Sequence, residues 1–228
     1  MRIAIAAPLM CGALVCGVLV TSPPASAAPA ACAALAGTVR ADGLCQVQVS
    51  NPAYTMDIAF PLDYPDEQAI VDYLTQTRDG FVNVSETPDS RNLPHEMDVT
   101  AESLRSARTR SVVLTLFQDI GSAHPTTWYK SFTYDIERGR PVTFDTLFAP
   151  GTQPLDAIFP IVQRTLDSQT GLAAHISPGD GRDPSHYQNF AITDDSVIFY
   201  FGRAELLPSY AGETSVTVPR NAIPVLQV

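Results

Sequence analysis

The segment Gly121–Phe132, GSAHPTTWYKSF, gathers the rarest side chains of this 228-residue chain. His124 is one of 4 histidines, Trp128 is the single tryptophan, and Lys130 is the only lysine. An imidazole and an amine could act as an acid–base pair, but such a pair needs a nucleophile beside it. The structural alternative makes His124 a turn residue, and lays the stem of Lys130 over apolar neighbours. We therefore take His124, Trp128 and Lys130 as candidate binding residues and assign no catalytic residue.

The common signatures of catalysis are missing from the sequence. It contains no G-x-S-x-G, no S-x-x-K, no P-loop and no G-x-G-x-x-G. His124, His175 and His186 are too widely spaced for a zinc motif, and Asp180–Asp183 has too few oxygen donors for calcium. Among 24 acidic residues, carboxylate pairs arise by chance and carry no signal. We expect no metal and no cofactor.

The first 27 residues have the pattern of a signal peptide. A short positive start precedes the apolar run Ile3–Val20, and Ala25–Ala27 forms an A-x-A cleavage site. A retained membrane anchor and a lipoprotein are the alternatives. The run ends in prolines and a processing site, and Cys11 and Cys16 lie inside it rather than at its end. We predict cleavage after Ala27, which leaves a secreted, extracellular chain without a membrane anchor.

Two cysteines, Cys32 and Cys45, remain in the predicted mature chain. In an exported protein such a pair indicates one disulfide rather than two free thiols. A loop of this length stabilises a fold by ~3 kcal/mol in the chain-entropy model.

The net charge limits the classes of partner that the chain can bind. The chain has 14 basic and 24 acidic residues, a net charge of −10. Nucleic acid and anionic membranes should be repelled. We therefore expect a protein or glycan ligand, host proteins included, and a monomer.

The hydrophobic pattern predicts strands and helices in blocks. A hairpin spans Gln46–Leu62, and a helix follows from Pro65 to about Asn83. Further strands are expected over 95–107, 111–120, 126–136, 187–193, 196–201 and 214–219. Within Leu155–Thr170 we expect a short turn before Pro160, the main helix after it, and Gly171 as its C-cap.

The absence of βαβ regularity predicts an α+β fold with a mixed, mainly antiparallel sheet and two principal helices. Residues 28–228 should form one domain, with subregions 28–110 and 111–228. Aromatic residues crowd its last third. They can form the core of a sheet or line an exposed groove for a sugar or peptide; they are Tyr187, Phe190, Phe199, Tyr200, Phe201 and Tyr210.

Three segments, 121–148, 187–212 and 216–223, together with the leader and the cysteine pair, resemble the mycobacterial secreted immunogenic protein family, the antigen called "sixty-four". The second half is also similar to the extracytoplasmic module of RsiV-like anti-sigma factors, which precedes some peptidoglycan deacetylase domains. Those relatives commonly show Gly-Gly-x-His where this chain has Gly121-Ser122-Ala123-His124. The resemblance implies a β-grasp-like part, no established catalytic residue, and in the RsiV-like relatives the binding of a host lysozyme.

Our leading hypothesis from sequence is a secreted, non-enzymatic immunogenic and interaction protein of the mycobacterial envelope or culture fluid. A cell-wall or carbohydrate-active hydrolase, using acidic residues and His124, is the alternative from another class. A lysozyme-binding protein is the third.

Overall fold

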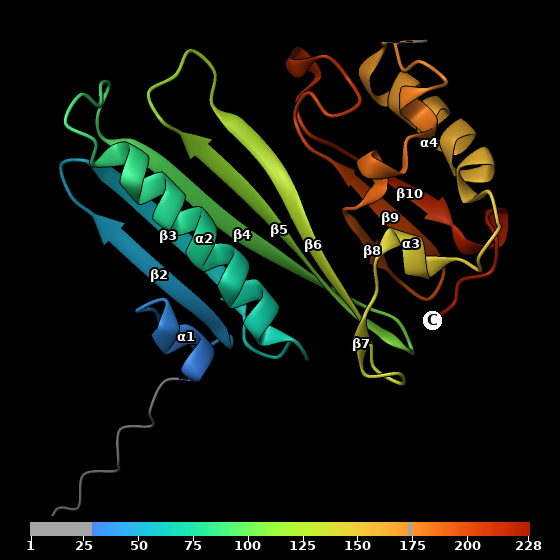
Figure 1. Ribbon diagram of the computed structural model, residues 1–228, viewed down its shortest axis with the longest axis horizontal. Coiled ribbons are helices and arrows are strands. Elements are labelled where there is room, and N and C mark those ends of the chain that lie inside the picture. The colour runs from blue at the N-terminus through green and yellow to red at the C-terminus, as the bar shows by residue number, and fades with distance from the viewer. Residues whose placement is uncertain (1–28, 173–174) are drawn as a thin grey trace, which may run out of the picture.

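The structure, a computed structural model, describes residues 29–172 and 175–228 (Figure 1). The predicted signal peptide, with Cys11 and Cys16, lies outside the described residues. Across the part that is described, no helix combines the length and apolar character needed to cross a membrane.

A seven-stranded sheet forms the larger half of the fold, with its strands in sequence order. Every neighbouring pair is antiparallel except β3 and β4, which run parallel. A parallel pair needs a long crossover, and helix α2 (Glu67–Ser85) provides it. The strands are β1 (Thr38–Val39), β2 (Leu44–Ser50), β3 (Tyr54–Pro61), β4 (His95–Arg105), β5 (Thr109–Asp119), β6 (Thr126–Asp135) and β7 (Arg140–Pro141).

Helix α2 lies across one face of this sheet, as Figure 1 shows. Ile70, Val71, Leu74 and Phe81 are buried beneath it, which confirms the predicted helix and its apolar stripe. Beside the edge strand β1, the short helix α1 (Ala30–Ala34) contacts α2 and β1.

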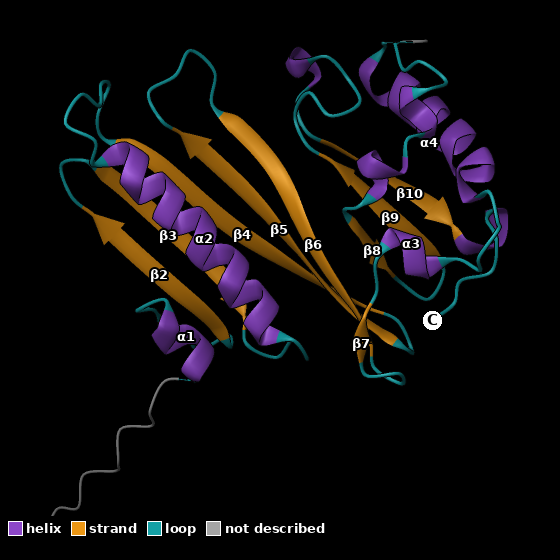
Figure 2. Ribbon diagram, viewed as in Figure 1, coloured by secondary structure: helices purple, strands orange, loops and turns teal. Residues whose placement is uncertain are grey.

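A three-stranded antiparallel sheet, in the order β10-β9-β8, forms the smaller half (Figure 2). Its strands are β8 (Phe190–Ile192), β9 (Ser196–Phe201) and β10 (Thr214–Pro219), and helices α3 (Phe144–Leu147) and α4 (Pro154–Thr170) pack against it. β9, which confirms the strand predicted over 196–201, lies in the centre of this sheet. Five of the six aromatic residues that crowd this region are buried, and only Tyr210 is exposed, at 71%. Four short 3-10 helices complete the described elements: η1 (Asp180–Arg182), η2 (Pro184–Tyr187), η3 (Ser209–Ala211) and η4 (Arg220–Ala222).

Helix α4 corrects one sequence-based expectation. It runs without a break through Pro160, where we expected a turn followed by the main helix. The proline removes one backbone hydrogen bond, but Ile158 and Phe159 before it and Val162 and Leu166 after it are all buried in one core. That shared burial outweighs the local penalty. Gly171 ends the helix at φ 70°, as predicted.

The two sheets meet along the second face of β6. Ser131 N–H donates to Asn189 Oδ1 at 3.0 Å, and Thr133 Oγ1 donates to the carbonyl of Phe190 at 3.1 Å. The polar face of this alternating strand is therefore largely covered by the second sheet and satisfied there. The fold is α+β with a mixed, mainly antiparallel sheet and two main helices, as predicted, whereas the β-grasp-like part stays a prediction.

Candidate functional site

The structure brings two of the three predicted binding residues together. Trp128 and Lys130 lie two positions apart on β6 and face the same side of the sheet as α2. His124 lies in the loop before β6, is exposed, and among the described residues its ring makes no hydrogen bond or ion pair. Its carbonyl accepts a hydrogen bond from Ser122 Oγ at 2.9 Å, as expected of a turn residue.

We call Trp128, Lys130, Phe132 and Tyr134 the β6 strip. Its members are all half-buried, because α2 covers only one side of them. Trp128 Nε1 donates to Tyr73 Oη at 2.9 Å, and Lys130 Nζ lies 5.5 Å from the centre of the Tyr73 ring and 5.4 Å from that of Phe132. The lysine charge is thus held by aromatic faces and not by a carboxylate. The strip can contact a ligand, but it contains no serine, threonine or cysteine.

A serine–histidine hydrogen bond that sequence reasoning missed lies at the end of α2. His95 Nδ1 is 3.1 Å from Ser85 Oγ, and His95 Nε2 is 3.1 Å from the carbonyl of Arg91. Ser85 Oγ also donates to the carbonyl of Phe81 at 2.8 Å. Ser85 is 1% exposed and His95 is 2% exposed. A nucleophile must reach its substrate, and this pair is buried. We therefore assign it a structural role, in which it holds the end of α2 against β4.

Gly121, three residues before His124, occupies a position that suits only glycine. It adopts φ +69°, and a Cβ there would lie 2.6 Å from the carbonyl oxygen of Arg91 and 3.3 Å from His95 Nε2. Asn92 Nδ2 also donates to the Gly121 carbonyl at 2.8 Å. The close backbone approach therefore belongs to the first glycine position of the Gly-Gly-x-His pattern, which this chain keeps, while Ser122 at the second position is exposed.

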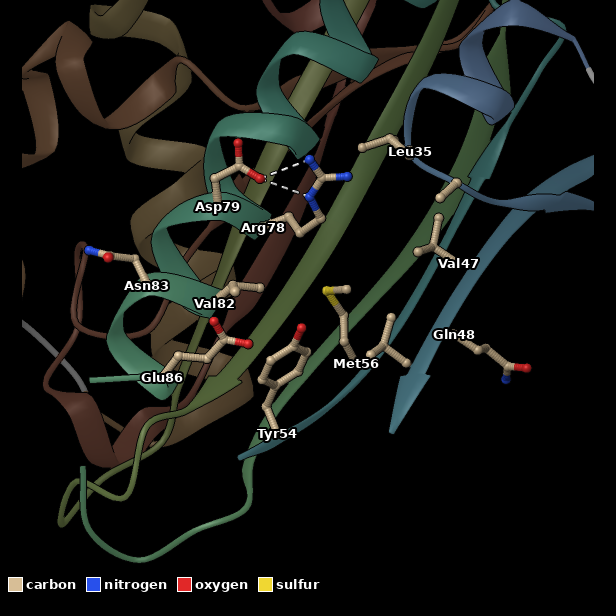
Figure 3. A pocket seen from close by; sticks show the side chains of 12 residues that line it. Leu35, Val47, Gln48, Tyr54, Met56, Arg78, Asp79, Val82, Asn83 and Glu86 are labelled. Atoms are coloured by element: carbon tan, nitrogen blue, oxygen red, sulfur yellow. Dashed lines mark hydrogen bonds and ion pairs between the residues drawn. The ribbon is translucent and has the colours of Figure 1, made fainter. Parts of the chain in front are cut away.

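A pocket of about 480 Å³ opens between the second half of α2 and the layer formed by α1, β2 and β3 (Figure 3). Its apolar wall consists of Leu35, Val47, Met56 and Val82. Volume and lining fall within the range of small-molecule sites. The hydrophobic pattern of α2 does not predict this pocket, because the apolar stripe of the helix faces the sheet, whereas the neighbouring helix face lines the pocket.

Charged side chains line the helix side of this pocket. Arg78 Nε lies 2.9 Å from Asp79 Oδ1, and the Arg78 side chain is only 23% exposed. Glu86, about two turns further and just past the end of α2, adds a second carboxylate. Because Asp79 neutralises Arg78, the pocket as a whole carries one excess negative charge.

Tyr54 supplies an unpartnered polar group to the same pocket. The residue is 8% exposed, and in the described chain its hydroxyl has no hydrogen-bond partner. Every fully buried side-chain nitrogen or oxygen of the described residues does have a partner. The Tyr54 hydroxyl must therefore open onto the pocket, and Figure 3 shows it pointing there beside Met56.

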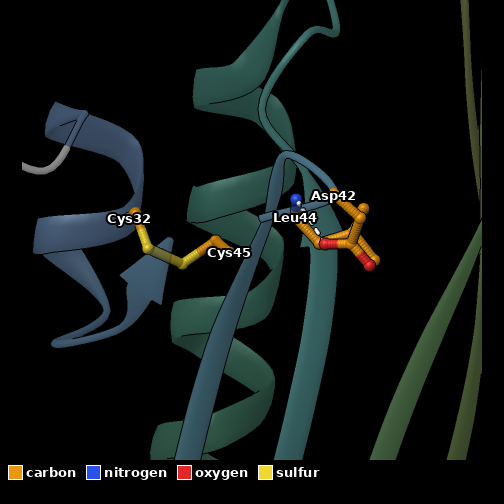
Figure 4. Close-up of a disulfide and its surroundings, with 4 residues drawn as sticks. All are labelled: Cys32, Asp42, Leu44 and Cys45. Carbon is orange, nitrogen blue, oxygen red and sulfur yellow. Dashed lines mark hydrogen bonds between the residues drawn. A yellow bond between two sulfur atoms is a disulfide. The ribbon is translucent and has the colours of Figure 1, made fainter. Parts of the chain in front are cut away.

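The disulfide fixes the far wall of the pocket. Cys32 and Cys45 are bonded, as predicted, and join α1 to β2 (Figure 4). Gly37 passes so close that a Cβ there would lie 2.5 Å from Cys45 Sγ. The bond holds α1 against the sheet and so positions Leu35 over Val47.

A second group of titratable side chains lies where the two sheets meet. The rings of Tyr129 and Tyr200 are 5.2 Å apart, and Tyr200 Oη donates to Glu102 Oε2 at 3.4 Å. Burial first, then the nearby carboxylates, raise the pKa of both phenols. Burial also raises the pKa of Glu205, whose Oε2 accepts the Gly202 N–H at 2.6 Å. These phenols stay protonated at neutral pH and cannot act as bases there.

Metal chemistry finds no support in this geometry. Within residues 29–172 and 175–228, no three His, Cys, Asp or Glu side chains are grouped so as to hold an ion.

Comparison with known proteins places the chain among mycobacterial relatives. It is 57% identical over 200 residues to a Mycobacterium tuberculosis protein named Esterase Rv3036c, covering 86% of this chain and 88% of that protein. It is 46% identical over 183 residues to Immunogenic protein MPT64 of the same species, covering 78% and 80% respectively.

The second half also matches a described domain family. Residues 145–221 match the family described as Protein of unknown function (DUF3298). A crystal structure of a DUF3298 family member from Bacteroides fragilis has a similar fold, with a TM-score of 0.53 at 13% identity, covering 81% of this chain and 92% of that one.

Proposed function

The chain belongs to the MPT64 immunogenic protein family, and from this premise we propose that it is an exported hydrolase of carboxylic esters. The observation that carries the proposal is the 57% identity to a protein named an esterase, which extends over 88% of that protein. Sequence patterns alone favoured a non-enzymatic protein because no catalytic motif is present. The proposal replaces that preference with the alternative from the hydrolase class, directed at esters.

The geometry limits how such a hydrolase can work. The buried Ser85–His95 pair is out of reach of a substrate, so we assign it a structural role and name no nucleophile. The reaction must use a group that solvent can reach.

The test is hydrolysis of p-nitrophenyl butyrate by the purified protein. We expect saturable turnover that disappears on heat unfolding. Reaction with a fluorophosphonate, followed by peptide mapping, should identify an accessible serine and leave Ser85 unmodified. A rate that stays linear in substrate and survives unfolding would contradict the proposal.

A binding role without hydrolysis is the second candidate, and the β6 strip favours it. A half-exposed row of aromatic side chains around one lysine suits contact with a protein or glycan. Lysozyme is the partner that the RsiV-like resemblance implies.

Surface plasmon resonance with immobilised hen lysozyme tests this candidate. Binding at micromolar concentration that persists at 0.3 M salt and is weakened by Lys130→Met would support it. Binding that vanishes with salt, or that Lys130→Met leaves unchanged, would count against the strip.

A further inference from the structure

We infer that the pocket between α2 and the α1–β2–β3 layer is a binding site for neutral acyl esters, with the Tyr54 hydroxyl as the donor to the ester carbonyl. The inference deepens the proposed ester hydrolysis and rests on it for the substrate class. The pocket itself is argued from its own geometry.

The Tyr54 hydroxyl is the first ground for this assignment. Tyr54 is 8% exposed, its hydroxyl has no protein partner among the described residues, and the hydroxyl reaches solvent at the pocket that it faces (Figure 3). A ligand in the pocket can take the place of water as the hydrogen-bond partner of this hydroxyl. A phenolic O–H can donate to a carbonyl oxygen, which is the only strong acceptor an ester offers.

The apolar wall is the second ground. Leu35, Val47 and Met56 are buried and Val82 is half-buried, and together they face the same space as the hydroxyl. Each methylene that moves from water onto such a wall strengthens binding about fourfold. An acyl chain would therefore lie along these side chains while its carbonyl reaches Tyr54.

The charges select a neutral ligand. Arg78 is already paired with Asp79 at 2.8 Å, so its positive charge is compensated. Glu86 then leaves the lining with a net negative charge, which repels a free fatty acid. An uncharged ester is accepted, and its carboxylate product is expelled.

The experiment separates binding from turnover by using a ligand that cannot be hydrolysed. ¹⁵N-labelled protein is titrated with 2-decanone, a neutral carbonyl compound, and in parallel with decanoate. We expect 2-decanone to shift the amide resonances of Val47, Met56 and Val82, with decanoate at least tenfold weaker. Shifts confined to other residues, or equal affinity for decanoate, would overturn the inference.

Two variants test the wall and the hydroxyl. Val82→Trp fills the pocket and should abolish the shifts, whereas Val84→Trp, at a position 42% exposed on the same helix, should leave them unchanged. Tyr54→Phe removes only the hydroxyl and should raise the Kd about fivefold, the equivalent of one ordinary hydrogen bond. Tyr210→Phe, at an exposed tyrosine, is its control.

The two proposals fail in different ways. Binding of 2-decanone without any ester turnover would leave the pocket assignment standing and remove the proposed hydrolase. Turnover that Val82→Trp does not change, with no 2-decanone shifts at the pocket, would remove the pocket assignment and leave the hydrolase.

Discussion

His95 Nδ1 lies 3.1 Å from Ser85 Oγ in the interior between α2 and β4, and the two side chains share fewer protons than their contacts require. A hydroxyl has one proton and a neutral imidazole has one. Three contacts compete for these two protons: the hydroxyl with Phe81 O, the imidazole with Arg91 O, and the two side chains with each other. Both protons are therefore used within the fold, and none is left for a substrate.

Replacement of Ser85 separates a structural from a catalytic role. Ser85→Ala leaves His95 Nδ1 without a partner, so the free energy of unfolding should fall by about 1–3 kcal/mol while ester turnover per folded molecule stays unchanged. Urea denaturation and p-nitrophenyl butyrate hydrolysis measure the two effects. Loss of turnover at unchanged stability would instead make Ser85 the nucleophile.

Thr87→Ala is the matched control for that substitution. Thr87 Oγ1 donates to Asn83 O at 2.9 Å, the same contact to the carbonyl four residues earlier, but in an exposed position. Its loss should change stability by less than about 0.5 kcal/mol.

Gly121 should be intolerant of a side chain. Gly121→Ala places a Cβ 2.6 Å from the Arg91 carbonyl at φ +69°, so the loop 86–94 must move and the free energy of unfolding should fall by about 2–4 kcal/mol. Gly151→Ala has a similar φ of +82° with nothing within 4 Å and should lose only about 1 kcal/mol. Equal losses in urea denaturation would show that backbone strain alone matters at Gly121.

The strongest sequence patterns predicted the elements that position the site. The stripe of α2 and the alternation of β5 and β6 follow from burial on one face, which is a local property of the sequence. The break predicted at Pro160 was wrong because the pattern shows only the local cost of a proline in a helix. It does not show that the residues on both sides of Pro160 are buried in one core. The pocket could not be predicted, because Tyr54 and Arg78 meet only through the parallel pairing of β3 and β4 and the crossover between them.

The candidate site residues were predicted only in part. Trp128 and Lys130 stand out by rarity and share a strand face, so alternation sufficed to place them together. His124 shares the rarity but lies in a turn, where no periodicity fixes a direction. Gly121 could be recognised as special, but its partners Arg91 and His95 come from a loop and strand about thirty residues earlier.

The hydrogen bond from Trp128 to Tyr73 should couple the β6 strip to α2. Tyr73→Phe removes the acceptor but keeps the ring under Lys130, so the Tm should fall by about 2–4 °C, the equivalent of about 1 kcal/mol in a chain of this size. Because Trp128 is the single tryptophan, its fluorescence reports directly on the strip, and its emission maximum should shift. Tyr210→Phe serves as the control, and an unchanged spectrum and Tm in Tyr73→Phe would mean that the bond does not form in solution.

Asp135 should make the free energy of unfolding depend on pH in the acidic range. Burial acts to raise the pKa of this carboxyl, but the backbone N–H, the side-chain hydrogen bond and the charge of Arg138, with the N–H of Glu137, outweigh burial and hold it below its ordinary value. The folded chain thus binds this proton less readily than the unfolded chain. Its contribution is therefore complete above the unfolded pKa, near 4, and is lost as the pH falls through the folded pKa.

Asp135→Asn removes this titration. Free energies of unfolding measured in urea from pH 7 to pH 3 should fall more steeply for the parent than for Asp135→Asn, whatever stability the variant has at pH 7. Asp89→Asn, at an exposed carboxylate in the loop 86–94, should keep the parent slope. Parallel curves for the parent and Asp135→Asn would mean that Arg138 does not hold this carboxylate ionised.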